Sequence, residues 1–282
     1  MSRERTSTIE GFVTLLVWKR FSRGAVDRLG RRSRDNDPVE PPDRRLQSDI
    51  SSDHEEVAAA LRSNVNSLLI QTARAKTLES AVAKLRRSPF RLSQIADIGG
   101  CRITVPDLRR QDDATGFLLV LYPESRVVDH REKSQCGYRA VHVIVKTATG
   151  RLVEVQVRTR TQDTWANTSE RLAGRFGIDV KYCGGPPAIR SALDLLSEDG
   201  RGLDQQLGGV VGILTRAAAL DEQLRSIEQA LGEAARADAR FIEVESEIPP
   251  LETEMTELLV ALRRAVETFG TLAASVGEMG SE

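Results

Sequence analysis

Cysteine is scarce in this sequence, and its scarcity limits the kinds of scaffold that the chain can build. Three cysteines occur among 282 residues, at Cys101, Cys136 and Cys183. So small and scattered a set excludes a disulfide framework and a four-ligand zinc site. The cysteine content therefore predicts a protein of the reducing cytoplasm.

Long apolar segments are also absent. The longest near the start, residues 12–18, is much shorter than the roughly 20 residues that span a bilayer, and no small-residue cleavage site follows it. Apolar residues nevertheless make up 40% of the chain, which is enough to bury a core. The sequence thus predicts a globular protein without an export signal and without a membrane partner.

The net charge is only −1, but charge is distributed unevenly along the chain. Between residues 74 and 110 basic side chains far outnumber acidic ones. The basic ones are Arg74, Lys76, Lys84, Arg86, Arg87, Arg91, Arg102, Arg109 and Arg110, and the acidic ones are Glu79, Asp97 and Asp107. This segment could bind an anionic ligand, or it could be a solvated helix face.

The N-terminal third has the patterns of helices and loops. We expect a helix over residues 10–33, a proline-containing loop over 35–43, and then a long helix with an apolar face between Val57 and Leu69. A second helix over residues 78–87 should end at the Ser88-Pro89 pair.

The central segment changes to the pattern of strands. We expect strands over residues 98–105, 126–129, 138–147 and 151–159, with a hairpin turn over 147–150. In the last strand, valines alternate with polar residues. Val153, Val155 and Val157 fall on one face, and Glu154, Gln156 and Arg158 fall on the other. The valine face should be buried. The polar face should either hold functional side chains or be exposed to solvent at an edge of the sheet.

The C-terminal part returns to helical spacing. After a helix over 163–176 and a turn over 183–187, we expect two helices between residues 220 and 269, separated at Pro249-Pro250. Their apolar stripes are Leu220, Leu224, Ile227 and Leu231, then Leu251, Met255, Leu258, Leu259 and Leu262. Since a two-helix hairpin buries only one side of each helix, these stripes predict contact with the rest of the chain or with a second copy.

Two acids could share a magnesium ion. Asp97 precedes Gly99 and Gly100 at the start of a predicted strand, and Glu154 lies on another strand. Magnesium usually binds one or two carboxylates together with substrate phosphates. A simple turn cap remains the alternative for Asp97.

Two further groups could bind nucleotides. Lys76, Ser80 and Lys84 are spaced four apart, so on a helix they would share a face able to hold a triphosphate, although a solvated face has the same pattern. Tyr138 and His142 would share one strand face, where the ring could stack on a base. Both could instead be core residues, which is the commoner case for a tyrosine, although Gly137 would leave room for a ligand.

The order and spacing of these signals resemble the synthetase domain of the RelA/SpoT family, especially its small single-domain alarmone synthetases. The resemblance covers roughly residues 45–187. It rests on the segments RAKTLESAVAKLRR, DIGGCRITV, GYRAVHVIV, VEVQVRTRTQDTWA and KYCGGPP.

The resemblance implies roles for individual residues. Matches to the ATP-phosphate motif are Arg74, Lys76, Ser80, Lys84 and Arg102; matches to the catalytic and Mg²⁺-binding acids are Asp97 and Glu154; matches to acceptor-binding residues are Tyr138, His142, Gln156 and Arg158. Relatives often carry Lys and Asn where this chain has Ser134 and Cys136. The preference among GMP, GDP and GTP therefore stays open.

The resemblance also implies a fold and an activity. The expected fold is α/β (α+β), a mixed central sheet flanked by helices and related to nucleotidyltransferases. The implied segments are an N-terminal helical segment and linker over 1–44, a synthetase domain over 45–187, and a C-terminal helical region over 188–282. The expected reaction moves pyrophosphate from ATP to the 3′-hydroxyl of GDP or GTP. We also expect the chain to self-associate through its C-terminal helices.

Two other functions remain compatible with the sequence. One is a toxic relative that pyrophosphorylates adenine nucleotides or the 3′ end of tRNA. The other is an inactive nucleotide-binding or interaction module, against which the presence of both Asp97 and Glu154 argues. With only His54, His130 and His142 present, no His-Asp metal cluster of a hydrolase can be assembled.

Overall fold

The computed structural model describes residues 23–35, 70–75, 84–86, 91–94, 99–132, 134, 136–146 and 152–279. It divides the chain into two compact units, each built from separate stretches of sequence. Unit 1 consists of Met1–Thr104, Asp113–Asp129 and Ala140–Arg158, and unit 2 consists of Val105–Asp112, His130–Arg139 and Thr159–Glu282. The predicted boundary at residue 187 comes from the extent of the family resemblance, and it stays a prediction.

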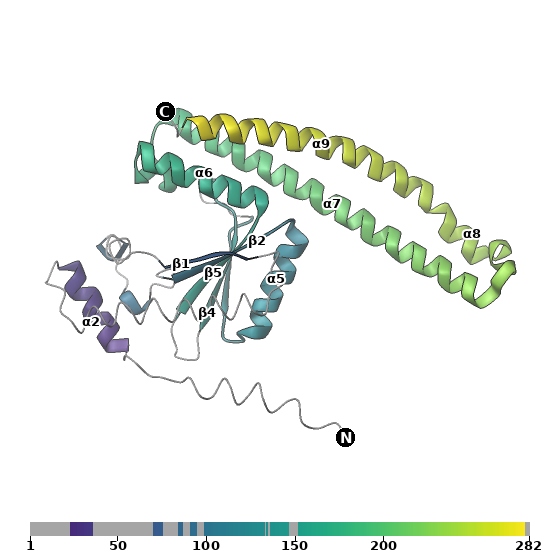
Figure 1. Ribbon diagram of the computed structural model, residues 1–282, viewed down its shortest axis with the longest axis horizontal. Helices are drawn as coiled ribbons and strands as arrows, with labels where there is room; N and C mark the ends of the chain where they lie inside the picture. Colours follow the sequence, from purple (N-terminus) through teal and green to yellow (C-terminus); the bar gives the residue numbers. More distant parts are fainter. Residues whose placement is uncertain are drawn as a thin grey trace, which may run out of the picture. The chain divides into compact units, whose positions relative to one another are not determined.

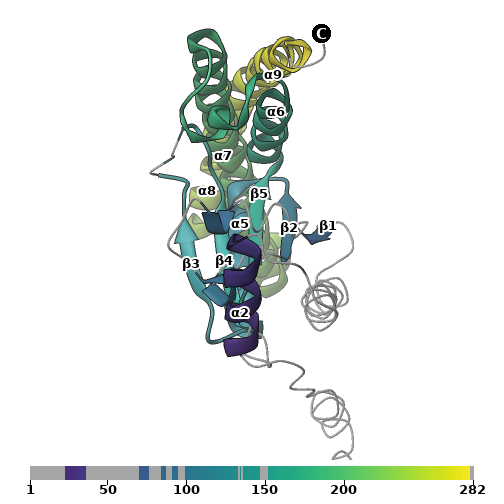
Figure 2. The same ribbon diagram turned by 90° about the vertical axis from the view of Figure 1, so that its left-hand side faces the viewer.

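A five-stranded sheet forms the centre of unit 1, in the order β1-β2-β5-β4-β3 (Figure 2). Its strands are β1 (Ile70–Ala75), β2 (Gly99–Val105), β3 (Arg126–Asp129), β4 (Val141–Lys146) and β5 (Leu152–Thr159). The predicted mixed sheet flanked by helices is confirmed. All four predicted strands are present, and β1 is an edge strand that we did not predict.

Valine alternation explains the hairpin of β4 and β5. The two strands pair antiparallel, with Val143 opposite Val155 and Val145 opposite Val153. All four side chains are fully buried, as expected for one dry face of a pleated strand. The turn that joins the strands lies outside the described residues.

Helical segments of unit 1 pack against one another through small and apolar residues. In α2 (Arg23–Arg34), Gly30 lies so close to η1 (Leu92–Gln94) that an added Cβ would be 2.6 Å from the Cβ of Leu92. The Asp27 carboxylate accepts a hydrogen bond of 3.1 Å from the backbone of Ser93. This pair of contacts explains why α2, part of the helix predicted over residues 10–33, is fixed to a distant segment.

Two helices follow the strands of the sheet. After β2 comes α5 (Leu108–Leu121), which we did not predict, and its Leu118 is fully buried. After β5 comes α6 (Arg160–Phe176). It begins three residues before the predicted start because Thr159 and Gln162 form a capping box, in which each side chain bonds the other residue's backbone amide.

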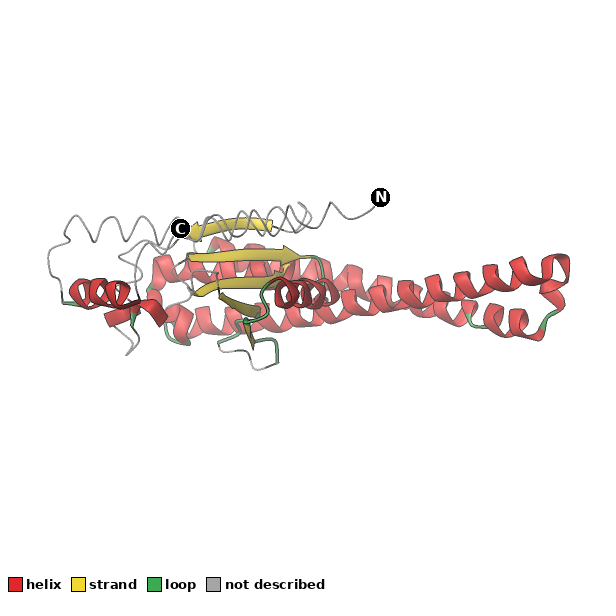
Figure 3. Ribbon diagram, turned by 90° about the horizontal axis from the view of Figure 1, so that it is seen from below, coloured by secondary structure: helices red, strands yellow, loops and turns green. Residues whose placement is uncertain are grey.

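A long helical hairpin dominates unit 2 (Figures 1 and 3). It runs out along α7 (Pro187–Leu231), turns through η4 (Gly232–Ala237) and α8 (Ala239–Ser246), and returns along α9 (Ile248–Glu278). The predicted hairpin is therefore present, and a helix boundary lies just before Pro249-Pro250, between α8 and α9, but the chain reverses earlier, through η4. These prolines lie in the first turn of α9, where no backbone donor is needed.

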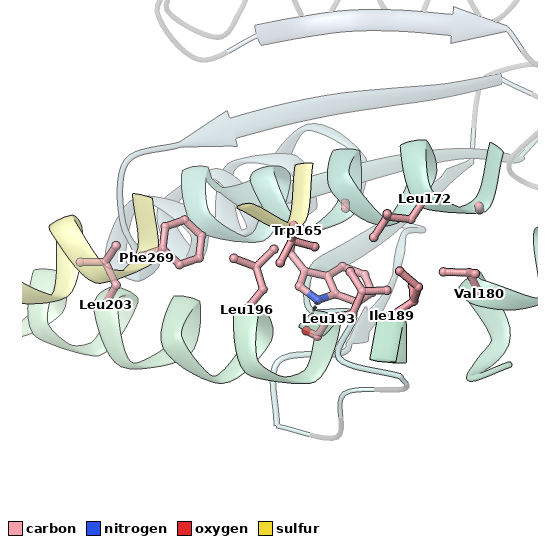
Figure 4. Close-up of a cluster of buried hydrophobic side chains, with 11 residues drawn as sticks. Trp165, Leu172, Val180, Ile189, Leu193, Leu196, Leu203 and Phe269 are labelled. Atoms are coloured by element: carbon pink, nitrogen blue, oxygen red, sulfur yellow. Dashed lines mark hydrogen bonds between the residues drawn. The ribbon is translucent and has the colours of Figure 1, made fainter. Parts of the chain in front are cut away.

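The base of this hairpin shares a core with α6, as Figure 4 shows. Trp165 of α6 is buried among α7 side chains, and its indole N–H donates to the Leu193 carbonyl at 2.8 Å. From α9, Phe269 and Val276 enter the same core. The predicted stripes are only partly buried, because Leu231 and Leu259 are 37% and 48% exposed.

The cysteines depart from the expectation of reduced thiols. Cys136 and Cys183 are joined by a disulfide, and Cys183 directly follows η3 (Ile178–Tyr182). Cys101 is free and buried in β2. The scattered spacing concealed the pair because it joins residues 47 positions apart. Among the helices of the described ranges, none is long and apolar enough to cross a membrane.

Candidate functional site

Polar side chains form a connected row on one face of β4 and β5. At its centre is Glu154, whose Oε1 lies 3.1 Å from Nδ1 of His142. The other carboxylate oxygen of Glu154 accepts a hydrogen bond of 2.7 Å from Nε2 of Gln156. Gln156 Oε1 in turn accepts from Arg158, also at 2.7 Å. Four of the predicted site residues are thus brought into direct contact.

Strand register explains why these side chains meet. His142 lies directly opposite Gln156, and Glu154 lies opposite Ile144, so His142 reaches Glu154 diagonally across the antiparallel pair. The side chains of His142 and Glu154 are each 14% exposed. The carboxylate is therefore held in one orientation by two neighbours while it retains access to solvent or substrate.

The predicted ATP-phosphate residues are spread over several segments. Arg102 lies in β2 and is half-buried, and Lys84 lies in a short helical stretch beside the buried Leu85. Arg74, which the resemblance assigns to the ATP-phosphate motif, lies in β1 opposite Gly100. Lys76 and Ser80 lie outside the described residues, so their predicted helical face stays a prediction.

The acidic residues bear on the expected magnesium ion. The described part of the chain contains no group of three or more His, Cys, Asp or Glu able to hold a metal. Magnesium does not need such a group, because one or two carboxylates and substrate phosphates suffice. Glu154 fits this requirement, since each carboxylate oxygen can accept more than one contact. Its predicted partner Asp97 lies outside the described residues.

Tyr138 has a different setting from the one its sequence position suggested. Strand β4 begins at Val141, so Tyr138 is not on the strand face of His142 as predicted, and the two residues belong to different units. The Tyr138 ring makes edge contacts with His130 and Trp165, at centroid distances of 5.9 and 6.0 Å. One side of the ring is thus anchored in the protein, while the residue remains only partly buried.

The space beside Gly137 is also different from our expectation. Its φ is +82°, and an added Cβ would lie 3.1 Å from Trp165 and from Ser197. We predicted that this glycine leaves room for a ligand. Two protein side chains take that room instead, so glycine is required here for packing and for backbone conformation.

Helix α7 holds the segment around Tyr138 in place. The Ser197 hydroxyl donates to the Gly137 carbonyl at 2.6 Å. Arg139 donates to the Ser197 side chain, to the Ser197 carbonyl at 3.0 Å, and to Glu198 at 2.7 Å. The hydrogen bond from Arg139 is the main reason that the pKa of Glu198 is lowered. Local sequence patterns did not predict these contacts, because they join residues 58 and 60 positions apart.

A buried carboxyl group lies close to the start of α6. The Thr159 hydroxyl donates to Asp204 Oδ2 at 2.8 Å and also contacts the Thr161 hydroxyl at 2.9 Å. Asp204 is only 3% exposed, and burial raises its pKa to about 6, against the opposing effect of the two threonine hydrogen bonds. No sequence pattern singled out this residue, because Asp204 lies in a polar stretch of helix close to Asp199, Arg201 and Gln205.

Comparison with known proteins gives one matching family model and two informative relatives. The region found in RelA / SpoT proteins matches residues 73–173. An uncharacterized protein from Mycobacterium tuberculosis (strain H37Rv) is 32% identical over 210 residues, which are 71% of this chain and 72% of that protein. GTP pyrophosphokinase YjbM of Bacillus subtilis is 30% identical over 166 residues, or 52% of this chain and 74% of that enzyme.

One solved structure supports the fold. A GTP pyrophosphokinase family protein from Streptococcus pneumoniae aligns with a TM-score of 0.50 at 22% identity, covering 64% of this chain and 98% of that structure. At this identity the likeness establishes the fold alone. The matched share agrees with a common fold to which additional residues are attached in this chain.

Proposed function

Because this chain belongs to the RelA/SpoT family, we propose that it transfers the pyrophosphate group of ATP to the ribose 3′-hydroxyl of GDP or GTP, giving (p)ppGpp and AMP. One observation carries the proposal. The row of His142, Glu154, Gln156 and Arg158 presents an oriented carboxylate beside polar and cationic groups. That combination matches the need to activate a hydroxyl next to anionic phosphates.

Glu154 is the proposed general base. It accepts the proton of the acceptor 3′-hydroxyl while the oxygen attacks the β-phosphorus of ATP, the bond to the α-phosphate oxygen breaks, and AMP leaves. A positioned base of this kind typically accelerates a reaction by about 10²–10⁴-fold. Contacts from His142 and Gln156 keep the carboxylate from rotating away from the hydroxyl.

Cationic side chains supply the electrostatic part of the catalysis. Phosphoryl transfer depends mainly on positioning two anions and on neutralising the charge that develops between them. For the ATP phosphates we assign Arg102 and Lys84, together with Arg74, Lys76 and Ser80. For the acceptor we assign Tyr138, His142, Gln156 and Arg158, with Tyr138 offering its less enclosed side to the base.

Magnesium is the proposed cofactor, with Glu154 and Asp97 as the protein ligands. When bound, it supplies positive charge next to the transferring phosphates. The reaction uses soluble nucleotides, and we propose that it takes place in the cytoplasm. Neither a membrane nor tRNA is required.

The proposal is tested with purified protein, magnesium and ATP labelled at the γ-phosphate. Separate reactions contain GDP, GTP, GMP, unlabelled ATP or deacylated tRNA, and the labelled products are separated by chromatography. We expect label on the 3′ position of GDP or GTP and stoichiometric AMP.

The other acceptors make the result decisive. Label transferred to adenine nucleotides or to tRNA, with none on guanine nucleotides, would replace the proposed acceptor with that of a toxic relative. No transfer to any acceptor, from protein that still binds nucleotide, would identify an inactive binding module.

A further inference from the structure

The segment that carries Tyr138 is anchored at both ends of a four-residue stretch, Cys136–Arg139, which we call the Tyr138 loop. At one end Cys136 is bonded to Cys183. At the other end Arg139 bonds Ser197 and Glu198 of α7. All of these partners belong to unit 2, so the anchors form one continuous structure.

The two anchors differ in chemistry. The hydrogen bonds and ion pair of Arg139 persist under any redox condition, whereas the bond between Cys136 and Cys183 can be broken by a thiol. Cys183 is exposed and Cys136 is half-buried, so a reductant can reach the sulfur of Cys183. In contrast, Cys101 is buried with only 4% exposure.

Backbone conformation indicates that the loop would change once the bond opens. Cys136 and Cys183 have φ values of 58° and 63°, in the left-handed region that residues with a side chain rarely adopt. Such conformations persist where the surrounding structure enforces them. Breaking the disulfide removes one source of that enforcement at both residues.

We propose that the Cys136–Cys183 disulfide is a redox switch for acceptor binding: the oxidised form holds the Tyr138 loop in its binding position, and a dithiol reductant releases it. The inference rests on the proposed function, because Tyr138 is there the residue that stacks on the acceptor base. It also explains how a disulfide fits a protein of the cytoplasm, where such bonds are usually transient or redox-sensing.

The redox step is an ordinary thiol–disulfide exchange. A thiolate of the dithiol attacks Sγ of Cys183, the bond to Cys136 breaks, and the Cys136 thiolate takes up a proton. The second thiol of the reductant then displaces Cys183 from the mixed disulfide. The protein gains two electrons and two protons, and the dithiol becomes a cyclic disulfide.

The bond itself is tested first. After alkylation of free thiols, trypsin should release residues 134–139 and 182–190 as one cross-linked species, since Lys133, Arg139, Lys181 and Arg190 provide the cleavage sites. Dithiothreitol should separate the two peptides. Two unlinked alkylated peptides from air-oxidised protein would overturn the proposal.

The response of the loop is tested without any enzymatic assay. The chain has two tryptophans, so a Trp18→Phe variant leaves Trp165 as the only one. Because Trp165 contacts the Tyr138 ring, its emission should change when the disulfide is reduced. Unchanged emission would overturn the switch regardless of what the synthetase assay gives, and so separates this inference from the proposed function.

The consequence for binding is measured on oxidised and reduced protein with a fluorescent GDP analogue and with ATP. Reduction should lower the affinity for the GDP analogue roughly threefold or more, because a preorganised binding segment is lost. The affinity for ATP should stay unchanged. Cys136→Ser and Cys183→Ser should each match the reduced wild type and be insensitive to dithiothreitol. Cys101→Ala should keep the full response. An equal loss of affinity for the GDP analogue and for ATP would indicate a general loss of protein structure and contradict the switch.

Discussion

Each carboxylate oxygen of Glu154 has a side-chain partner, His142 on Oε1 and Gln156 on Oε2. We expect Glu154→Gln to reduce the rate of synthesis by about 100-fold or more, because the amide cannot accept the hydroxyl proton. Circular dichroism and thermal melting should show an intact fold, since the replacement has nearly the same shape. Steady-state kinetics with saturating ATP and GDP provide the measurement.

Glu124 offers a matched control for this substitution. It lies in unit 1 and its side chain is 74% exposed, paired with Lys146 at 2.5 Å. An exposed ion pair of this kind contributes little, so Glu124→Gln should retain the wild-type rate. Equal rates for the Glu154 and Glu124 variants would remove Glu154 from the mechanism.

Asp204 should make the stability of the protein depend on pH. Its pKa is about 6 in the folded chain, against an ordinary value of 3.8. A carboxyl with a raised folded pKa contributes stability that is complete below its unfolded pKa and is lost as pH rises through the folded pKa. Asp204→Asn removes this loss, so its stabilising effect should be about 1 kcal/mol larger at pH 8 than at pH 5.

Urea unfolding at the two pH values measures that difference. Asp194→Asn is the control, because Asp194 is an exposed aspartate on the same helix. If Asp204→Asn raises the free energy of unfolding by the same amount at both pH values, burial of the charged carboxylate is not the cause of the stabilisation.

Individual site residues could be predicted from the sequence only where local periodicity decides their orientation. Alternation along β5 placed Glu154 and Gln156 on one face, as the structure confirms. Their contact with His142 depends on the register between strands, which alternation alone does not specify. Contacts such as Thr159 with Asp204, 45 positions apart, depend on packing and had no sequence signal.

At the scale of elements, glycines test which backbone positions the fold requires. Gly137→Ala should lower the free energy of unfolding by about 1–3 kcal/mol, because φ is +82° and the new methyl would lie 3.1 Å from Trp165. Gly212→Ala in α7 should raise it by about 0.5–1 kcal/mol, since its Cβ would meet nothing within 4 Å. Chemical denaturation of both variants gives the comparison, and a shift of the same sign in both would contradict it.

Element boundaries were harder to predict than element types, for identifiable physical reasons. Four strands of the sheet lie where runs of β-branched residues predicted them. Strand β1 was missed because its sequence, IQTARA, shows little alternation of apolar and polar residues. The hairpin of unit 2 turns at Gly232, where φ is +56°, rather than at the two prolines. Proline can start a helix as readily as it can end one, so its presence alone did not locate the turn.

For the whole molecule, the predicted self-association now has a more suitable test. Removing everything after Leu220 would also remove Phe269 and Val276 from the core around Trp165. Excising only residues 210–257 spares that core, because Phe269 and Val276 remain. The cut ends can be joined directly, because Gly209 lies within contact distance of Leu258 on the opposite arm. The excised part contains the exposed Leu214 and Ile242, at 56% and 54%.

We expect the full-length chain to have a mass in light scattering above the 31.1 kDa of one copy, and the shortened chain to be monomeric with its synthetase rate retained. A monomeric full-length protein would dismiss self-association through the hairpin. Loss of activity together with a monomeric shortened protein would instead show that assembly supports catalysis.

The interleaving of the two units has a consequence for synthesis on the ribosome. Every stretch of unit 1 precedes Thr159, whereas unit 2 draws on stretches from Val105 to the far end of α9. The sheet with its Glu154 row can therefore fold while the chain is still growing. The stretch His130–Arg139 must wait for residues translated more than a hundred codons later. A nascent chain should thus form its Glu154 row before it places Tyr138, so the proposed synthesis would begin only after translation is complete.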